Sequence, residues 1–197
     1  MQMALAHKFV QMGRMMSTRS PAFSFIGLLM LSSVAFAAGK PHEHGIVKLD
    51  VAIDGPQVTM TLSAPLDSLL GFERTPRTEA ERRAAAGVLA QLRSPREVAA
   101  FFAMDDAARC ALTKAEVSAP ALEPGVRSSV PSGPSEHADL DATYVFVCAQ
   151  PAQLRSLQMG LFDGYKRIQR IDVQVAGPKG QTKVTLKRPA RSITLSR

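Results

Sequence analysis

Cysteine is scarce in this chain of 197 residues, which contains only Cys110 and Cys148. Their wide separation argues against a redox-active or metal-binding pair, which normally has the close spacing Cys-x-x-Cys. An even cysteine count, with each residue beside a candidate strand, is typical of a protein in an oxidising compartment. We therefore predict a disulfide between them, worth about 4 kcal/mol from the entropy of loop closure.

Catalytic signatures are also absent. The sequence contains no Gly-x-Ser-x-Gly elbow, no glycine loop that would cradle phosphate and no His-Glu-x-x-His motif. The most visible acidic pair, Asp105-Asp106, is interpreted as an exposed helix end. The sequence therefore predicts that the protein is not an enzyme.

Acidic residues are missing from the first 37 positions, which contain Lys8, Arg14 and Arg19 followed by an apolar run that ends in Ala35-Phe36-Ala37. This pattern is typical of a Sec-type signal peptide over residues 1–37. The apolar run is short for a membrane span of about 20 residues, and no second run follows. We expect a periplasmic protein with no membrane attachment after cleavage.

The net charge of the remaining chain is small. Residues 38–197 keep 21 of the 24 Lys and Arg and all 17 Asp and Glu, which leaves a net charge of +4. These charges are spread along the chain without interleaved aromatic residues, so no nucleic-acid partner is predicted. The length suits a single domain with a sizeable core.

Hydrophobic periodicity predicts a β-hairpin followed by two helices. Apolar residues alternate over 47–53 and again over 58–62, with Asp54-Gly55 as the turn between them. Thr78 and Glu81 have the spacing of a capping box, which predicts a helix over about 78–92. Ser94-Pro95-Arg96-Glu97 predicts the start of a second helix.

The second half of the chain is dominated by strand patterns. A loop rich in Pro, Ser and Gly at about 123–141 separates two strands that contain the cysteines. Further strands are predicted near 171–175 and in "QTKVTLKR", with a helical turn around 161–165. The expected fold class is α+β: a single domain over 38–197 with a mainly antiparallel β-sheet and about three short packed helices.

Three histidines remain after signal cleavage: His42, His44 and His137. In an extended segment, His42 and His44 project to the same side with their Cβ atoms about 7 Å apart, so both imidazoles can reach one ion. Glu43 then faces the other way, where it could serve a second site or turn inward. Zinc and copper both accept such a pair of ligands.

A zinc site needs more than two protein ligands, since zinc normally takes four, or three and a water. His137 is the natural third candidate, because it lies beside Glu136 and Asp139 in the predicted loop. The alternative interpretation stays open: His42-Glu43-His44 is a polar leader to the strand, and His137 is a solvated loop residue.

The order of these features resembles the ZrgA-like family of periplasmic zinc-binding proteins. The resemblance runs from His42 to about Leu195 and rests on His-Glu-His-Gly at 42–45, Gly-Phe-Glu at 71–73, the two cysteines in their contexts and Leu161-Phe162. It implies an antiparallel sheet with packed helices and a role in zinc acquisition. Family members carry a long His/Asp/Glu tract between the cysteine-containing strands, which here is reduced to His137 with its acidic neighbours.

The expected function is therefore that of a periplasmic accessory protein that binds Zn²⁺ reversibly and supports zinc uptake or buffering. Copper remains a second candidate ion, since the order of divalent affinities favours it. The family resemblance implies the periplasmic binding protein of a zinc ABC importer as a partner. The alternative is an envelope protein-interaction module, whose sheet edge or Phe-bearing helix docks another protein and whose histidines are incidental.

Overall fold

The computed structural model describes residues 43–123 and 138–195. The predicted signal peptide and most of the predicted loop lie outside the described residues. The strands are β1 (Ile46–Asp54), β2 (Gln57–Pro65), β3 (Phe102–Met104), β4 (Cys110–Ser118), β5 (Asp139–Cys148), β6 (Ser156–Met159), β7 (Arg170–Gly177), β8 (Gly180–Lys187) and β9 (Ser192–Thr194). The helices are α1 (Leu66–Leu70), α2 (Glu79–Arg93), α3 (Pro95–Phe101) and α4 (Leu161–Gly164), with 3₁₀ turns η1 (Asp106–Ala108), η2 (Pro120–Leu122) and η3 (Pro151–Gln153).

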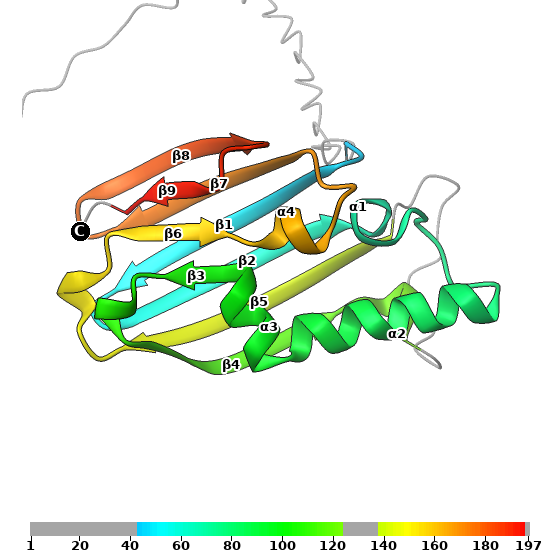
Figure 1. Cartoon of the computed structure of the whole chain (residues 1–197), viewed down its shortest axis with the longest axis horizontal. Coiled ribbons are helices and arrows are strands. Elements are labelled where there is room, and N and C mark those ends of the chain that lie inside the picture. Colours follow the sequence, from blue (N-terminus) through cyan, green and yellow to red (C-terminus); the bar gives the residue numbers. More distant parts are fainter. Residues whose placement is uncertain (1–42, 124–137, 196–197) are drawn as a thin grey trace, which may run out of the picture. The chain divides into compact units, whose positions relative to one another are not determined.

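Two sheets organise the domain. The larger sheet has the strand order β4-β5-β2-β1-β7-β8, and the smaller one has the order β3-β6-β9. Every pairing is antiparallel except that of β1 with β7, which is parallel. Figure 1 shows α2, α3 and the small sheet in front of one face of the large sheet. The α+β prediction with a mainly antiparallel sheet is confirmed.

One face of the large sheet builds the core, while the other faces solvent. In β1, Val47, Leu49 and Val51 are at most 1% exposed, and the residues between them are exposed. In β5, Tyr144 is fully buried, whereas Val147 on the opposite face is 41% exposed. The period-two alternation predicted from the sequence therefore marks a sheet that is covered on one side.

Helices α2 and α3 cover the apolar face of the large sheet, and α2 begins at the capping box predicted from the sequence. Thr78 and Glu81 form the complete capping box at the start of α2. The Tyr144 hydroxyl donates a hydrogen bond of 3.0 Å to the carbonyl of Leu92, which ties α2 to the sheet. At the end of this helix, Arg93 pairs with Glu123 at 2.6 Å and so anchors the last described residue before position 124.

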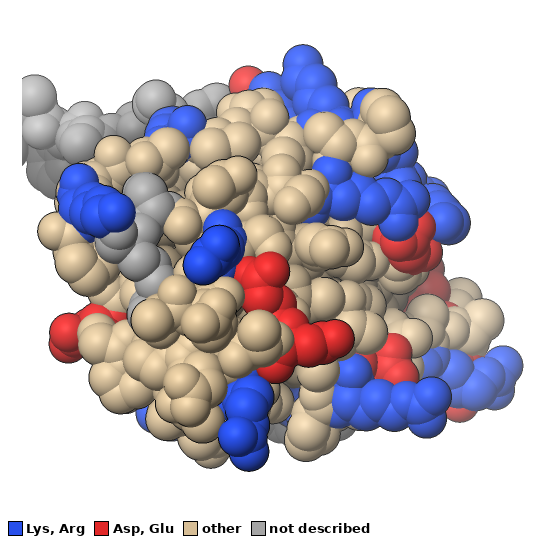
Figure 2. Space-filling view, turned by 60° about the vertical axis from the view of Figure 1, so that its left-hand side comes forward, with Lys and Arg blue, Asp and Glu red and all other residues tan. Residues whose placement is uncertain are grey.

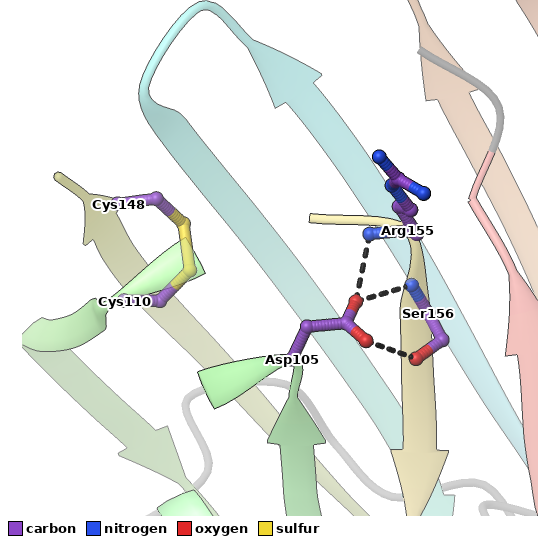
Figure 3. Close-up of a disulfide and its surroundings, with 5 residues drawn as sticks. All are labelled: Asp105, Cys110, Cys148, Arg155 and Ser156. Carbon is purple, nitrogen blue, oxygen red and sulfur yellow. Dashed lines mark hydrogen bonds between the residues drawn. A yellow bond between two sulfur atoms is a disulfide. The ribbon is translucent and has the colours of Figure 1, made fainter. Parts of the chain in front are cut away.

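Cys110 and Cys148 lie directly opposite each other in the β4–β5 pair and form a disulfide (Figure 3). The predicted bridge is thus confirmed. It joins β4, which is an edge strand of the large sheet, to its inner neighbour.

Asp105 joins the neighbouring strands β3 and β6 at one end of the small sheet (Figure 3). Its Oδ2 accepts hydrogen bonds of 2.7 Å from the backbone N–H groups of Arg155 and Ser156, and its Oδ1 accepts one of 2.9 Å from the Ser156 hydroxyl. The interpretation of Asp105 as an exposed helix end is therefore wrong, because its carboxylate bridges the end of β3 to the start of β6. The hydrogen bond from Arg155, followed by those from Ser156, lowers the pKa of Asp105 below its ordinary value of 3.8.

Asp105→Asn should lower the free energy of unfolding by about 1–3 kcal/mol at neutral pH, because the charged acceptor is lost. A lowered carboxyl pKa contributes stability above the ordinary value of 3.8, and that contribution is lost as the pH falls through the folded value. The gap between wild type and variant should therefore close in acid. Urea unfolding at pH 7 and at about pH 3 measures both effects. Asp106→Asn is the matched control; an equal loss in this variant would contradict the assignment.

Candidate functional site

The site is built on the turn that precedes β1. Gly45 has φ +77°, which lets the chain turn sharply directly after His44. Its N–H donates to the hydroxyl of the fully buried Ser68 at 3.0 Å, and its carbonyl accepts from the N–H groups of Gln169 at 2.8 Å and Arg170 at 3.1 Å. The backbone beside His44 is therefore held by α1 on one side and by the segment before β7 on the other.

The short helix α1 carries Asp67, the acidic residue that lies beside His44 in this turn. Its first N–H, that of Leu66, donates to the carbonyl of Ala138 at 2.9 Å. The helix ends at Gly71, which has φ +86° and donates its N–H to the carbonyl of Asp67. Gly71 turns the chain after α1, and Glu73 follows two residues later.

His44 meets two carboxylates. Its Nδ1 lies 3.1 Å from Oδ2 of Asp67 and 4.0 Å from Oε1 of Glu73. The imidazole is 61% exposed, while the Asp67 and Glu73 side chains are 21% and 12% exposed. The hydrogen bond to Asp67, and then the charge of Glu73, raise the pKa of His44 above its ordinary value of 6.5. A half-exposed imidazole is thus fixed against two largely covered carboxylates.

The contact with Asp67 selects the ring tautomer of neutral His44. Because Nδ1 lies at the carboxylate, it carries the proton, and the lone pair is on Nε2 at the other side of the ring. A carboxylate that accepts from one ring nitrogen while the other nitrogen binds a metal is the usual arrangement of metal-ligating histidines.

Arg167 places a positive charge beside the His44–Asp67 pair. Its Nη1 lies 4.0 Å from Oδ1 of Asp67, whereas the nearest Asp67 oxygen to His44 Nδ1 is Oδ2. The guanidinium lies against Gly71, where a Cβ would be only 2.6 Å from Nη2. Glycine at this position therefore leaves the space that the arginine occupies.

The other predicted ligands are placed differently. Glu43 pairs with Arg170 at 3.2 Å, and Arg170 also contacts Asp172 at 3.3 Å. Asp139 opens β5, where it aligns with Pro65 of β2, so the strand begins inside the loop predicted over 123–141. Glu43 and Asp139 both lie near the end of the large sheet at which β1 begins.

His42, Glu136 and His137 lie outside the described residues. Within residues 43–123 and 138–195, no three His, Cys, Asp or Glu side chains are grouped as a metal site. The described part thus contributes one oriented imidazole with its supporting carboxylates. Sequence reasoning missed Asp67, Glu73 and Arg167, and the Gly-Phe-Glu motif at 71–73 was the signal that pointed to Glu73.

Charge on the surface is mixed. Figure 2 shows a largely uncharged face with Lys and Arg side chains spread over it, several of them gathered at its upper right, and with Asp and Glu side chains between them. No helix of the described part is long and apolar enough to cross a membrane.

These features define an α+β domain with an oriented, half-exposed histidine at one end of its large sheet. A family model described as ZrgA family zinc uptake protein matches residues 41–195. The chain belongs to this family of zinc uptake proteins, and its role is therefore related to zinc. No curated protein matches the chain. The family and the disulfide are both consistent with an exported protein.

The pKa of His44 should be measurable above 6.5 in the metal-free protein, because Asp67 and Glu73 favour the charged imidazole. Asp67→Asn should bring this pKa back toward 6.5, since it removes the largest cause. Titration of the imidazole resonances by NMR follows both values. Asp50→Asn, which removes an exposed carboxylate from β1, should leave them unchanged. An identical His44 titration in wild type and Asp67→Asn would contradict the pairing.

Proposed function

We propose that this protein is a periplasmic accessory protein that binds Zn²⁺ reversibly and supports zinc uptake, with His44 as a nitrogen ligand. The observation that carries the proposal is the contact of 3.1 Å between Nδ1 of His44 and Asp67. This contact presents Nε2 as the metal-binding nitrogen and holds the ring in one orientation. Membership of a zinc uptake family supports zinc as the ion.

Asp67 acts in this proposal on the far side of the imidazole from the ion. A carboxylate that accepts the Nδ1 proton makes the ring a stronger donor, and removal of such a partner typically weakens metal binding 10- to 100-fold. Glu73 adds negative charge 4.0 Å from the same nitrogen. The two carboxylates thus favour a dication near His44.

The remaining ligands are proposed to be His42 and His137. Zinc normally takes four protein ligands, or three and a water, and the described residues supply one nitrogen. His42 stands two positions before His44. His137 directly precedes Ala138, whose carbonyl accepts from Leu66 at the start of the helix that carries Asp67. Glu136 and Asp139 are the candidate oxygen ligands near His137.

The proposed role is to hold the ion and release it, without making or breaking covalent bonds. An imidazole that is 61% exposed remains accessible to a second protein that takes over the ion. The recipient we propose is the periplasmic binding protein of a zinc ABC importer. Copper is the competing ion, because imidazole accepts both metals. The predicted signal peptide and the disulfide support the periplasmic location.

Zinc titration by calorimetry of residues 38–197, disulfide-bonded and cleared with a chelator, should give sub-micromolar binding of about one ion per chain. The double variant His42→Ala, His44→Ala should lose most of this affinity and keep its fold, because both side chains precede β1. Titrating the same samples with copper compares the two ions.

Glu43→Gln provides a control within the same turn. Glu43 pairs with Arg170 and should contribute little, so this variant should bind zinc like the wild type. His137→Ala tests the ligand proposed from the loop. Unchanged zinc affinity in the double histidine variant would overturn the assignment of His42 and His44. Wild-type binding weaker than about 0.1 mM would instead favour the protein-interaction module.

A further inference from the structure

We infer that Arg167 is a built-in cation that limits zinc affinity at the His44 site and so favours release of the ion; this inference rests on the proposed function. The carboxylate of Asp67 lies near two partners. Oδ2 lies 3.1 Å from the His44 imidazole, and Oδ1 lies 4.0 Å from the Arg167 guanidinium. Arg167 therefore acts on the same carboxylate that orients and activates the proposed ligand.

The Arg167 guanidinium lies directly beside Gly71. An ideal Cβ on Gly71 would lie 2.6 Å from Nη2 and 2.7 Å from Cζ of Arg167, so the guanidinium lies in the space that a Cβ would fill. The carbonyl of Arg167 lies 3.2 Å from the corresponding position on Gly45, the residue after His44. The segment that carries Arg167 is thus packed against both glycines of the site.

The nearby Arg170 is engaged elsewhere. It contacts Glu43 at 3.2 Å and Asp172 at 3.3 Å, on the strand side of the turn. Among the ion pairs of the described residues, the cation at Asp67 other than His44 is Arg167.

Two effects of the positive charge of Arg167 weaken the binding of zinc at the His44 site. The guanidinium repels a dication directly. It also neutralises part of the negative charge of Asp67, which would otherwise make the His44 imidazole a stronger electron donor to the metal. Arg167 is 60% exposed, so water and salt weaken both effects. A change of about threefold in the zinc dissociation constant is the expected size at low ionic strength. A site tuned in this way binds the ion less tightly and gives it up faster.

Arg167→Gln should tighten zinc binding about threefold in calorimetric titration, slow the release of zinc to a chelator and enlarge the zinc-induced rise in melting temperature. The gain should shrink as salt is added. Arg167→Lys keeps the charge and should stay near the wild type. Lys166→Gln removes the same charge from the neighbouring exposed residue, which forms no ion pair within the described residues, and should tighten binding by less than half as much.

Tighter binding in Arg167→Gln alone supports the inference, since a variant that only disturbed the fold would bind zinc more weakly. Equal dissociation constants in Arg167→Gln and Lys166→Gln would overturn it, and so would weaker binding in Arg167→Gln, which would make Arg167 a positioning residue for Asp67. Either of these two results would leave the proposed function standing, provided that wild type binds zinc and His44→Ala abolishes the binding. Only the inference about Arg167 would then fail. If wild type fails to bind zinc saturably, the proposed function falls and the inference falls with it.

Discussion

The parallel pairing of β1 with β7 is the constraint on which the rest of the structure depends. It aligns Ile46 with Arg170, so that the N–H groups of Gln169 and Arg170 both reach the carbonyl of Gly45. The same register places Val47 and Leu49 in the core. A slip by one residue would turn every side chain of β1 to the opposite face of the sheet. The core and the His44 turn are therefore specified by one alignment of two strands that lie far apart in the sequence.

The elements that could be predicted are those with a strong local signal. Alternating apolar residues marked β1, β2 and β5, and the Thr78–Glu81 capping box marked α2. The parallel β1–β7 neighbours could not be predicted, because periodicity says which face of a strand is buried and nothing about which strand lies beside it. The joining of β3, β6 and β9 into a separate small sheet could not be predicted, because strands of three or four residues are too short for a periodicity that assigns a neighbour.

The site was predictable only in the part that lies along one segment of chain. His44 was found because two histidines stand at i and i+2 at the entrance to an alternating strand. Asp67 and Arg167 are single charged residues without a motif, and they acquire meaning only when α1 and the segment before β7 meet the turn at Gly45. Glu43 illustrates the same limit from the other side: its type suited a ligand, but Arg170 is its partner in the fold.

The segment between positions 123 and 138 leaves and re-enters the domain at two fixed points. Glu123 is paired with Arg93 at the end of α2, and the carbonyl of Ala138 accepts from Leu66. With its ends secured independently, an insertion between them changes neither the strand register nor the core. Doubling the length of a connecting segment costs only about 0.6 kcal/mol of closure entropy. The length of the chain between these two points can therefore change by insertion and deletion almost independently of the stability of the fold.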